Sequence, residues 1–125
     1  MPAKKGRAGR PLSFDLDAFL ESAAVFRRIV RFARGALVFA QGDDANSVFY
    51  VQTGGVKLSV LSLTGKEAVV AMLGPGDFFG EGCLAGQQIR MGTAEAVVPT
   101  TALSIPKQEM TRTLHEQPAF SDRFI

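Results

Sequence analysis

The sequence has only one cysteine and one histidine in 125 residues. A lone cysteine, Cys83, excludes an internal disulfide and any metal site built from several cysteines, and we expect its thiol to be a small buried apolar group. The single histidine, His115, lies outside every expected strand, whereas cupin-type jelly-roll enzymes hold a metal with two or three strand histidines. We therefore expect no metal, no catalytic residues and no enzymatic activity.

Long apolar runs are also missing. No run approaches the roughly 18 residues that a membrane-spanning helix requires. The basic N-terminus is not followed by the apolar segment of a secretory signal, and an unpaired cysteine fits a reducing compartment. These absences predict a cytoplasmic protein without a membrane partner. Hydrophobic residues make up 46% of the chain, which indicates one ordinary folded domain.

Charge is unevenly placed along the chain, whose formal net charge is +2. Lys4, Lys5, Arg7 and Arg10 stand together without an acidic residue among them. We interpret residues 1–13 as a basic flexible tail. The alternative is a weak, salt-sensitive contact with nucleic acid, which would carry no sequence specificity.

From residue 27 onward, short apolar or alternating runs are separated by turns rich in glycine, asparagine and aspartate. Short strands at roughly 8–12-residue spacing, with a turn signal between each, predict a sandwich or barrel. The expected fold is mainly β, a double-stranded β-helix or jelly-roll-like β-roll with flanking N- and C-terminal helices, in one domain over residues 14–120. A change of phase at Leu61 and Leu63 suggests a bulge. The expected strands cover 29–32, 37–39, 48–51, 56–60, 69–73, 90–98 and 101–105.

Helical patterns flank these strands. Residues 16–24 place apolar side chains on one face at helical spacing. Pro106 opens a second helix at its first position, and Pro118 ends or kinks it. Residues 121–125 are interpreted as the truncated start of a further, dimerisation helix. We expect a monomer or weak dimer with an exposed apolar patch near Phe120 and Phe124.

One segment, residues 74–86, breaks the alternation of strand and turn. It crowds glycines around Glu81, and glycine permits close approach of the backbone to a ligand. Residues 81–85 can form one helical turn with exposed N–H groups. Arg90, on the expected strand that follows, suits phosphate because its guanidinium can bond two oxygens at once. Glu81 would accept a hydrogen bond from a ribose hydroxyl, so the segment predicts a ribose–phosphate pocket. The alternative is a long loop with a surface Glu–Arg pair.

Three segments of the chain, in order, resemble the cyclic nucleotide-binding domain of the Crp/Fnr superfamily. They begin at Gly35, Val48 and Leu73, and read GALVFAQGD, VFYVQTGGVKL and LGPGDFFGE. The resemblance implies a ligand sensor, with cAMP or cGMP as the effector. It further implies contacts of Gly80 and Glu81 with the ribose and of Arg90 with the cyclic phosphate. The expected ligand-binding residues are Gly80, Glu81, Gly82, Cys83, Arg90 and Met91, and those expected to border the pocket are Leu73 and Phe79.

The chain departs from the family pattern immediately after Arg90. Members that bind cyclic AMP usually follow the arginine with Ser or Thr and then Ala, whereas this chain has Met91 and Gly92. Met91 cannot donate a hydroxyl hydrogen bond to phosphate. A hydrogen bond to a charged group contributes about 1.5–3 kcal/mol, so its loss weakens binding roughly ten- to a hundredfold. An alternative register would use Thr93 and Ala94, with Gly92 replacing the arginine.

The resulting prediction is the sensor domain of a Crp/Fnr-type transcription regulator without its own DNA-binding module. We expect a small ligand as partner, and specific nucleic-acid binding only through another protein. The alternative is a ligand-independent interaction module, which would form homodimers or heterodimers with full-length relatives and interfere with them.

Overall fold

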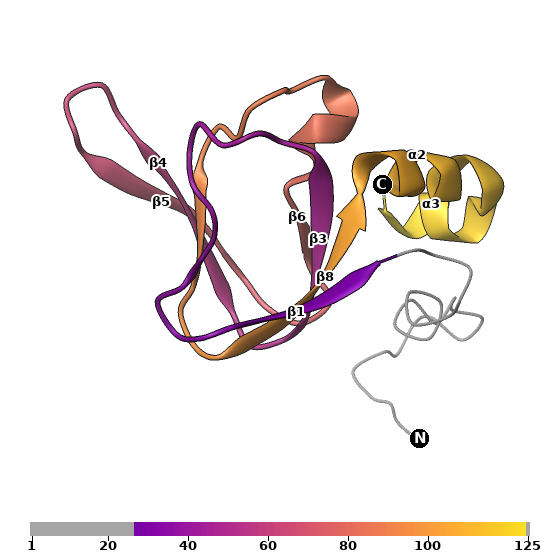
Figure 1. Cartoon of the computed structure of the whole chain (residues 1–125), viewed down its shortest axis with the longest axis horizontal. Helices are drawn as coiled ribbons and strands as arrows, with labels where there is room; N and C mark the ends of the chain where they lie inside the picture. The colour runs from indigo at the N-terminus through magenta and orange to yellow at the C-terminus, as the bar shows by residue number, and fades with distance from the viewer. Residues whose placement is uncertain (1–26, 125) are drawn as a thin grey trace.

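The computed structural model describes residues 27–124 and folds them into two four-stranded antiparallel sheets that close into a roll (Figure 1). One sheet has the strand order β1-β8-β3-β6 and the other β2-β7-β4-β5. The predicted fold class is confirmed, while the expected tail and the expected helix at 16–24 lie outside the described residues. The strands are β1 (Arg28–Phe32), β2 (Leu37–Phe39), β3 (Ser47–Thr53), β4 (Val56–Leu61), β5 (Glu67–Leu73), β6 (Phe78–Phe79), β7 (Thr93–Ala96) and β8 (Thr100–Pro106).

Strand β3 is buried on both faces, and this divides the core into two clusters. Because successive side chains alternate across a strand, Phe49 and Val51 belong to one cluster while Val48 and Tyr50 belong to the other. The first cluster includes residues of both sheets, and the second joins one sheet to the C-terminal helices. The buried members are Phe49, Val51, Val56, Phe79 and Ala94 in the first, and Ala45, Val48, Tyr50, Cys83, Leu103, Ile105, Met110 and Phe120 in the second.

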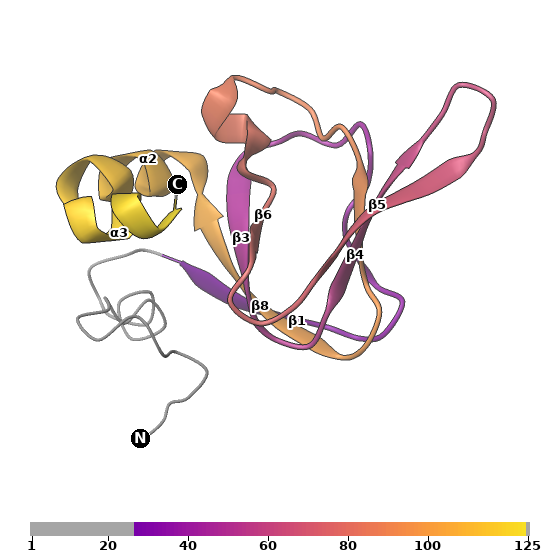
Figure 2. The same ribbon diagram turned by 180° about the vertical axis from the view of Figure 1, so that it is seen from behind.

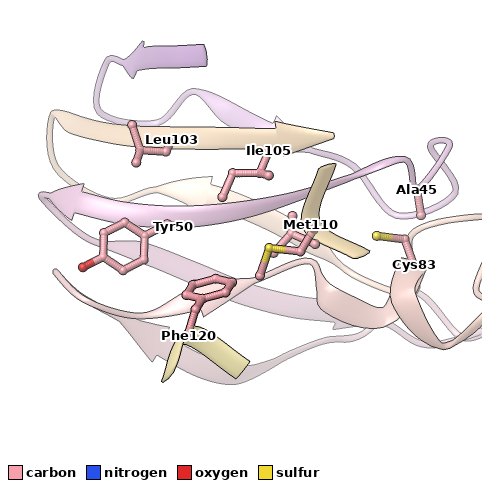
Figure 3. Close-up of a cluster of buried hydrophobic side chains, with 8 residues drawn as sticks. Ala45, Tyr50, Cys83, Leu103, Ile105, Met110 and Phe120 are labelled. Carbon is pink, nitrogen blue, oxygen red and sulfur yellow. The ribbon is translucent and has the colours of Figure 1, made fainter. Parts of the chain in front are cut away.

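Two helices, α2 (Lys107–Glu116) and α3 (Pro118–Phe124), lie against the sheet that contains β3 and β8 (Figures 1 and 2). Pro106 is the N-cap residue of α2, so the helix begins at Lys107, one position later than expected. Phe120 is fully buried in the second cluster (Figure 3). Its ring lies 6.0 Å from that of Phe78. The predicted exposed patch at Phe120 is therefore wrong, because α3 folds back and buries this ring in the core. The side chain of Phe124 lies outside the described residues.

Exposed apolar side chains gather instead on the β4–β5 hairpin, which projects from the roll away from α2 and α3 (Figures 1 and 2). β5 is an edge strand, so within residues 27–124 one side of its backbone has no neighbouring strand. The pairing of β4 with β5 shifts register between Leu58 and Ser59, earlier than the phase change at Leu61. No helix in residues 27–124 is long and apolar enough to cross a membrane. The exposed hairpin side chains are Leu61, Leu63, Val69, Val70 and Met72.

Candidate ligand-binding site

The predicted helical turn exists and begins at the end of β6. A 3₁₀ helix, η2 (Glu81–Ala85), follows Gly80, whose φ of 78° is a left-handed conformation that favours glycine. Gly80 thereby turns the chain from β6 into η2. Gly86, with a φ of 97°, ends the helix in the same way. The five-residue turn thus presents Gly80, Glu81 and Gly82 at one edge of the roll.

Arg90 reaches this edge from a different position than expected. The predicted strand at 90–98 starts too early, because β7 begins only at Thr93 and Arg90 precedes it. Its neighbour Ile89 forms an isolated bridge with Asp44, which holds the segment close to the roll. The extended segment therefore directs Arg90 inward without belonging to a sheet.

The guanidinium of Arg90 is buried, with 5% of the residue exposed. Its Nη1 donates a hydrogen bond to the Gly80 carbonyl at 2.9 Å, and its Nη2 donates to the Ser47 carbonyl at 2.7 Å. The ring of Phe39 lies 4.2 Å below the guanidinium carbon, within the range of a cation–π interaction. These contacts exclude the alternative of a surface Glu–Arg pair.

Arg90 forms no ion pair with the residues that the structure describes. Among residues 27–124, no carboxylate oxygen lies within 4.0 Å of its guanidinium, and its Nε is buried without a hydrogen-bond partner. Burial lowers the pKa of Arg90, because the loss of hydration outweighs the favourable interactions with Cys83 and Asp43. The arginine nevertheless remains protonated near neutral pH. The site therefore holds a desolvated positive charge that has no paired anion within the described part of the chain.

A cavity of about 340 Å³ opens beside Arg90, in the size range of small-molecule sites. Of the described residues that line it, Arg90 is the one basic residue and Glu81 the one acidic residue. The remaining walls are apolar or neutral. The lining residues are Phe39, Leu58, Ser59, Val60, Val70, Gly80, Glu81, Gly82, Gln87, Arg90, Met91, Gly92 and Thr93.

The cavity brings together five of the residues predicted to bind ligand: Gly80, Glu81, Gly82, Arg90 and Met91. Met91 stands at the rim with 60% of its surface exposed. The other three predicted residues do not line the cavity. Leu73 and Phe79 pack in the core between the sheets, because their strands direct these side chains inward. Cys83 packs in the core beneath α2.

The prediction that Cys83 is a buried apolar group is confirmed. Its Sγ lies 3.5 Å from the Gly80 carbonyl and 3.6 Å from the Ser47 carbonyl, both of which also accept bonds from Arg90. Burial raises the pKa of the Cys83 thiol, so the group remains protonated near neutral pH. Cys83 thus supports the floor beneath Arg90 from the core side.

Sequence reasoning missed several residues of the cavity. Gln87 gave no signal because it stands in a polar loop. The β4 residues gave none because the sequence does not show which face of this strand borders the cavity. Gly92 was considered only as part of an alternative register. An added Cβ at Gly92 would lie 2.7 Å from the backbone oxygen of Ser59, so glycine allows this loop to approach β4.

These features define the class of protein: a β-roll with a buried arginine beside a glycine-rich 3₁₀ turn and a cavity. Residues 29–117 match the cyclic nucleotide-binding domain family, and the chain belongs to it. It is 32% identical over 87 residues to a cyclic AMP receptor protein of Thermus thermophilus, covering 70% of this chain and 40% of that protein. It is 35% identical over 97 residues to a global nitrogen regulator of Synechococcus elongatus, covering 76% and 44%.

The fold agrees with solved structures of the same kind. The sensor domain of the transcriptional regulator DNR from Pseudomonas aeruginosa matches with a TM-score of 0.70 at 26% identity, over 77% of this chain and 65% of that chain. The chain spans less than half the length of the curated relatives described above. The comparisons therefore identify a domain related to the sensor domains of Crp/Fnr regulators.

Proposed function

We propose that this domain senses a small phosphate-bearing ligand, a cyclic nucleotide such as cAMP or cGMP, as part of cytoplasmic transcription control. The observation that carries the proposal is the buried charge of Arg90, which lines the cavity without a carboxylate partner among residues 27–124. Buried charges in proteins are normally paired, because desolvation without compensation is costly. A ligand phosphate would supply the missing negative charge.

The surroundings of Arg90 suit the rest of a nucleotide. Glu81 is exposed at the cavity wall, where its carboxylate can accept a hydrogen bond from a ribose hydroxyl. Leu58, Val60 and Val70 provide apolar walls against which a base can pack. The name of the Thermus thermophilus relative, cyclic AMP receptor protein, agrees with this ligand class.

Calorimetric titration of the purified chain with cAMP and cGMP tests the proposal. We expect binding of at least one nucleotide and a loss of roughly thirtyfold or more in Arg90→Ala, because removing one partner of a buried charge pair costs about 2 kcal/mol or more. Arg90 also bonds two carbonyls, so thermal unfolding must show that the variant is folded. The exposed Glu81→Gln provides a second variant with little structural role. Absence of heat with both nucleotides would contradict the proposal.

A second candidate function, a ligand-independent interaction module, is favoured by the exposed apolar hairpin β4–β5. Large exposed apolar patches mark interaction surfaces. Under this alternative, the chain self-associates without nucleotide, and Leu63→Lys with Met72→Lys shifts it to monomer in sedimentation velocity. If the wild-type chain is a monomer at micromolar concentration, self-association through the hairpin is contradicted.

A further inference from the structure

The carboxamide of Gln87 lies against Gly82 at the wall of the cavity. The backbone N–H of Gln87 donates to the Gly82 carbonyl at 3.2 Å, which draws the two residues together. A Cβ added to Gly82 would overlap Oε1 of Gln87 and lie 2.7 Å from its Cδ. Both residues line the cavity. The missing side chain at position 82 is therefore what makes room for the carboxamide.

The same relation holds between Gly80 and Arg90. A Cβ added to Gly80 would lie 2.8 Å from Nη1 of Arg90. Gly80 and Gly82 are two residues apart, so their Cα atoms are separated by at most about 7 Å. Each of the two glycines thus accommodates a polar side chain from the returning segment 87–90. The guanidinium and the carboxamide consequently flank the same short stretch of backbone.

The Gln87 carboxamide can still donate and accept hydrogen bonds. Within the described part of the chain, its side-chain N and O atoms make no hydrogen bond. Met91, at the position where the family pattern provides a hydroxyl, carries a thioether that cannot donate. The side-chain amide of Gln87 is a hydrogen-bond donor, and Gln87 lines the same cavity as Arg90.

We propose that Gln87 is a specificity-determining residue of this site, donating a hydrogen bond from Nε2 to the anionic group that Arg90 neutralises. This inference rests on the proposed function. In it, the Gln87 amide supplies the hydrogen-bond donor that the Met91 side chain lacks. A neutral amide adds a directional bond without a second positive charge. The pair of Gln87 and Arg90 therefore suits a singly charged phosphodiester, as in a cyclic nucleotide, better than a doubly charged phosphate monoester.

A double-mutant cycle on cAMP affinity tests this role. Gln87→Ala should weaken cAMP binding roughly tenfold, the effect of one hydrogen bond to a charged group. Gly82→Ala should weaken it similarly, because its methyl group displaces the carboxamide while leaving Gln87 in the chain. Position 82 does not have a positive φ, so alanine is compatible with the backbone there. Combined, the two substitutions should weaken binding no more than Gln87→Ala alone.

Gln88→Ala is the matched control, since Gln88 is the same residue type one position along and does not line the cavity. Its affinity should match that of the wild type. Wild-type affinity in Gln87→Ala would overturn the inference. A full additional loss from Gly82→Ala in the Gln87→Ala background would also overturn it, because the methyl would then exclude the ligand directly.

A second measurement separates this inference from the proposed function. The side-chain ¹⁵N–¹H₂ resonances of Gln87 are followed by NMR during titration with cAMP and with inorganic phosphate. Movement with phosphate that is reduced in Arg90→Lys supports the anion contact, even if cAMP gives no heat and the proposed ligand is wrong. Resonances that move with neither anion overturn the inference, whatever the affinity for cAMP.

Discussion

Gly80→Ala is expected to damage the protein in two separable ways. Alanine at a φ of 78° requires the left-handed conformation, which costs about 1–2 kcal/mol for a residue with a Cβ. The new Cβ would also lie 2.8 Å from Nη1 of Arg90 and so displaces the guanidinium. That displacement loses the bond from Arg90 to the Gly80 carbonyl, a charged hydrogen bond of about 1.5 kcal/mol or more.

Gly86→Ala provides the matched control for Gly80→Ala. Gly86 ends the same 3₁₀ turn with a φ of 97°, and nothing lies within 4 Å of an added Cβ. It should therefore incur the conformational cost alone. We expect Gly80→Ala to be less stable than Gly86→Ala by about 1.5 kcal/mol. In a domain of this size, the difference corresponds to a melting temperature lower by roughly 6–12 °C.

Urea unfolding followed by circular dichroism measures both variants, in the wild-type background and in Arg90→Ala. The excess cost at position 80 should disappear when Arg90 is absent, because the two substitutions act on one contact. Equal stability of Gly80→Ala and Gly86→Ala in the wild-type background would refute the reasoning. An excess that persists in Arg90→Ala would show that something other than the guanidinium occupies the space.

Three further predictions concern the core and the loop. Phe120→Ala should lower the free energy of unfolding by about 3–5 kcal/mol in urea titration, because the ring is fully buried; a change below about 0.5 kcal/mol would indicate a surface residue. Gly92→Ala should lower the free energy of unfolding by about 1–3 kcal/mol, since the added methyl group would contact the Ser59 backbone oxygen. An unchanged melting temperature would show that the loop moves to accommodate the methyl group without cost. Burial raises the pKa of Cys83 above its ordinary value of 9.0, so the unfolded chain releases this proton first and stability falls as pH rises above about 9. Urea titrations at pH 8 and pH 10 should show a steeper fall for the wild type than for Cys83→Ala, and equal slopes would contradict it.

The strands were predictable because their signals are local. Alternating residues such as Val56, Leu58 and Val60, closed by turns such as Gly54-Gly55, mark strand and turn without knowledge of the neighbours. The glycine-rich turn and its acidic residue were predictable for a similar reason. Gly80 and Glu81 stand in one short segment whose glycines exceed what a simple connection needs.

The errors fell where packing overrides local pattern. The pattern at 90–98 resembles one strand, yet pairing with β2 and β4 starts only at Thr93, which leaves Arg90 free to turn inward. Phe120 stands on an amphipathic helix in either case, and the sequence gives no indication of which surface that helix meets. Phe120 is buried because α3 packs back against the sheet.

The sequence by itself thus determined a β-roll, a glycine-rich turn and an arginine near it, because periodicity, turn chemistry and spacing are properties of neighbouring residues. Only the tertiary structure decided that Arg90 is buried without a carboxylate among residues 27–124, and that Gln87 lies against Gly82. Desolvation and close approach depend on segments distant along the chain, here β2, β3 and the 87–90 segment, meeting at one place. The residue types therefore indicated the chemistry of the pocket, whereas the position of Gln87 in the cavity wall emerged only from the tertiary structure.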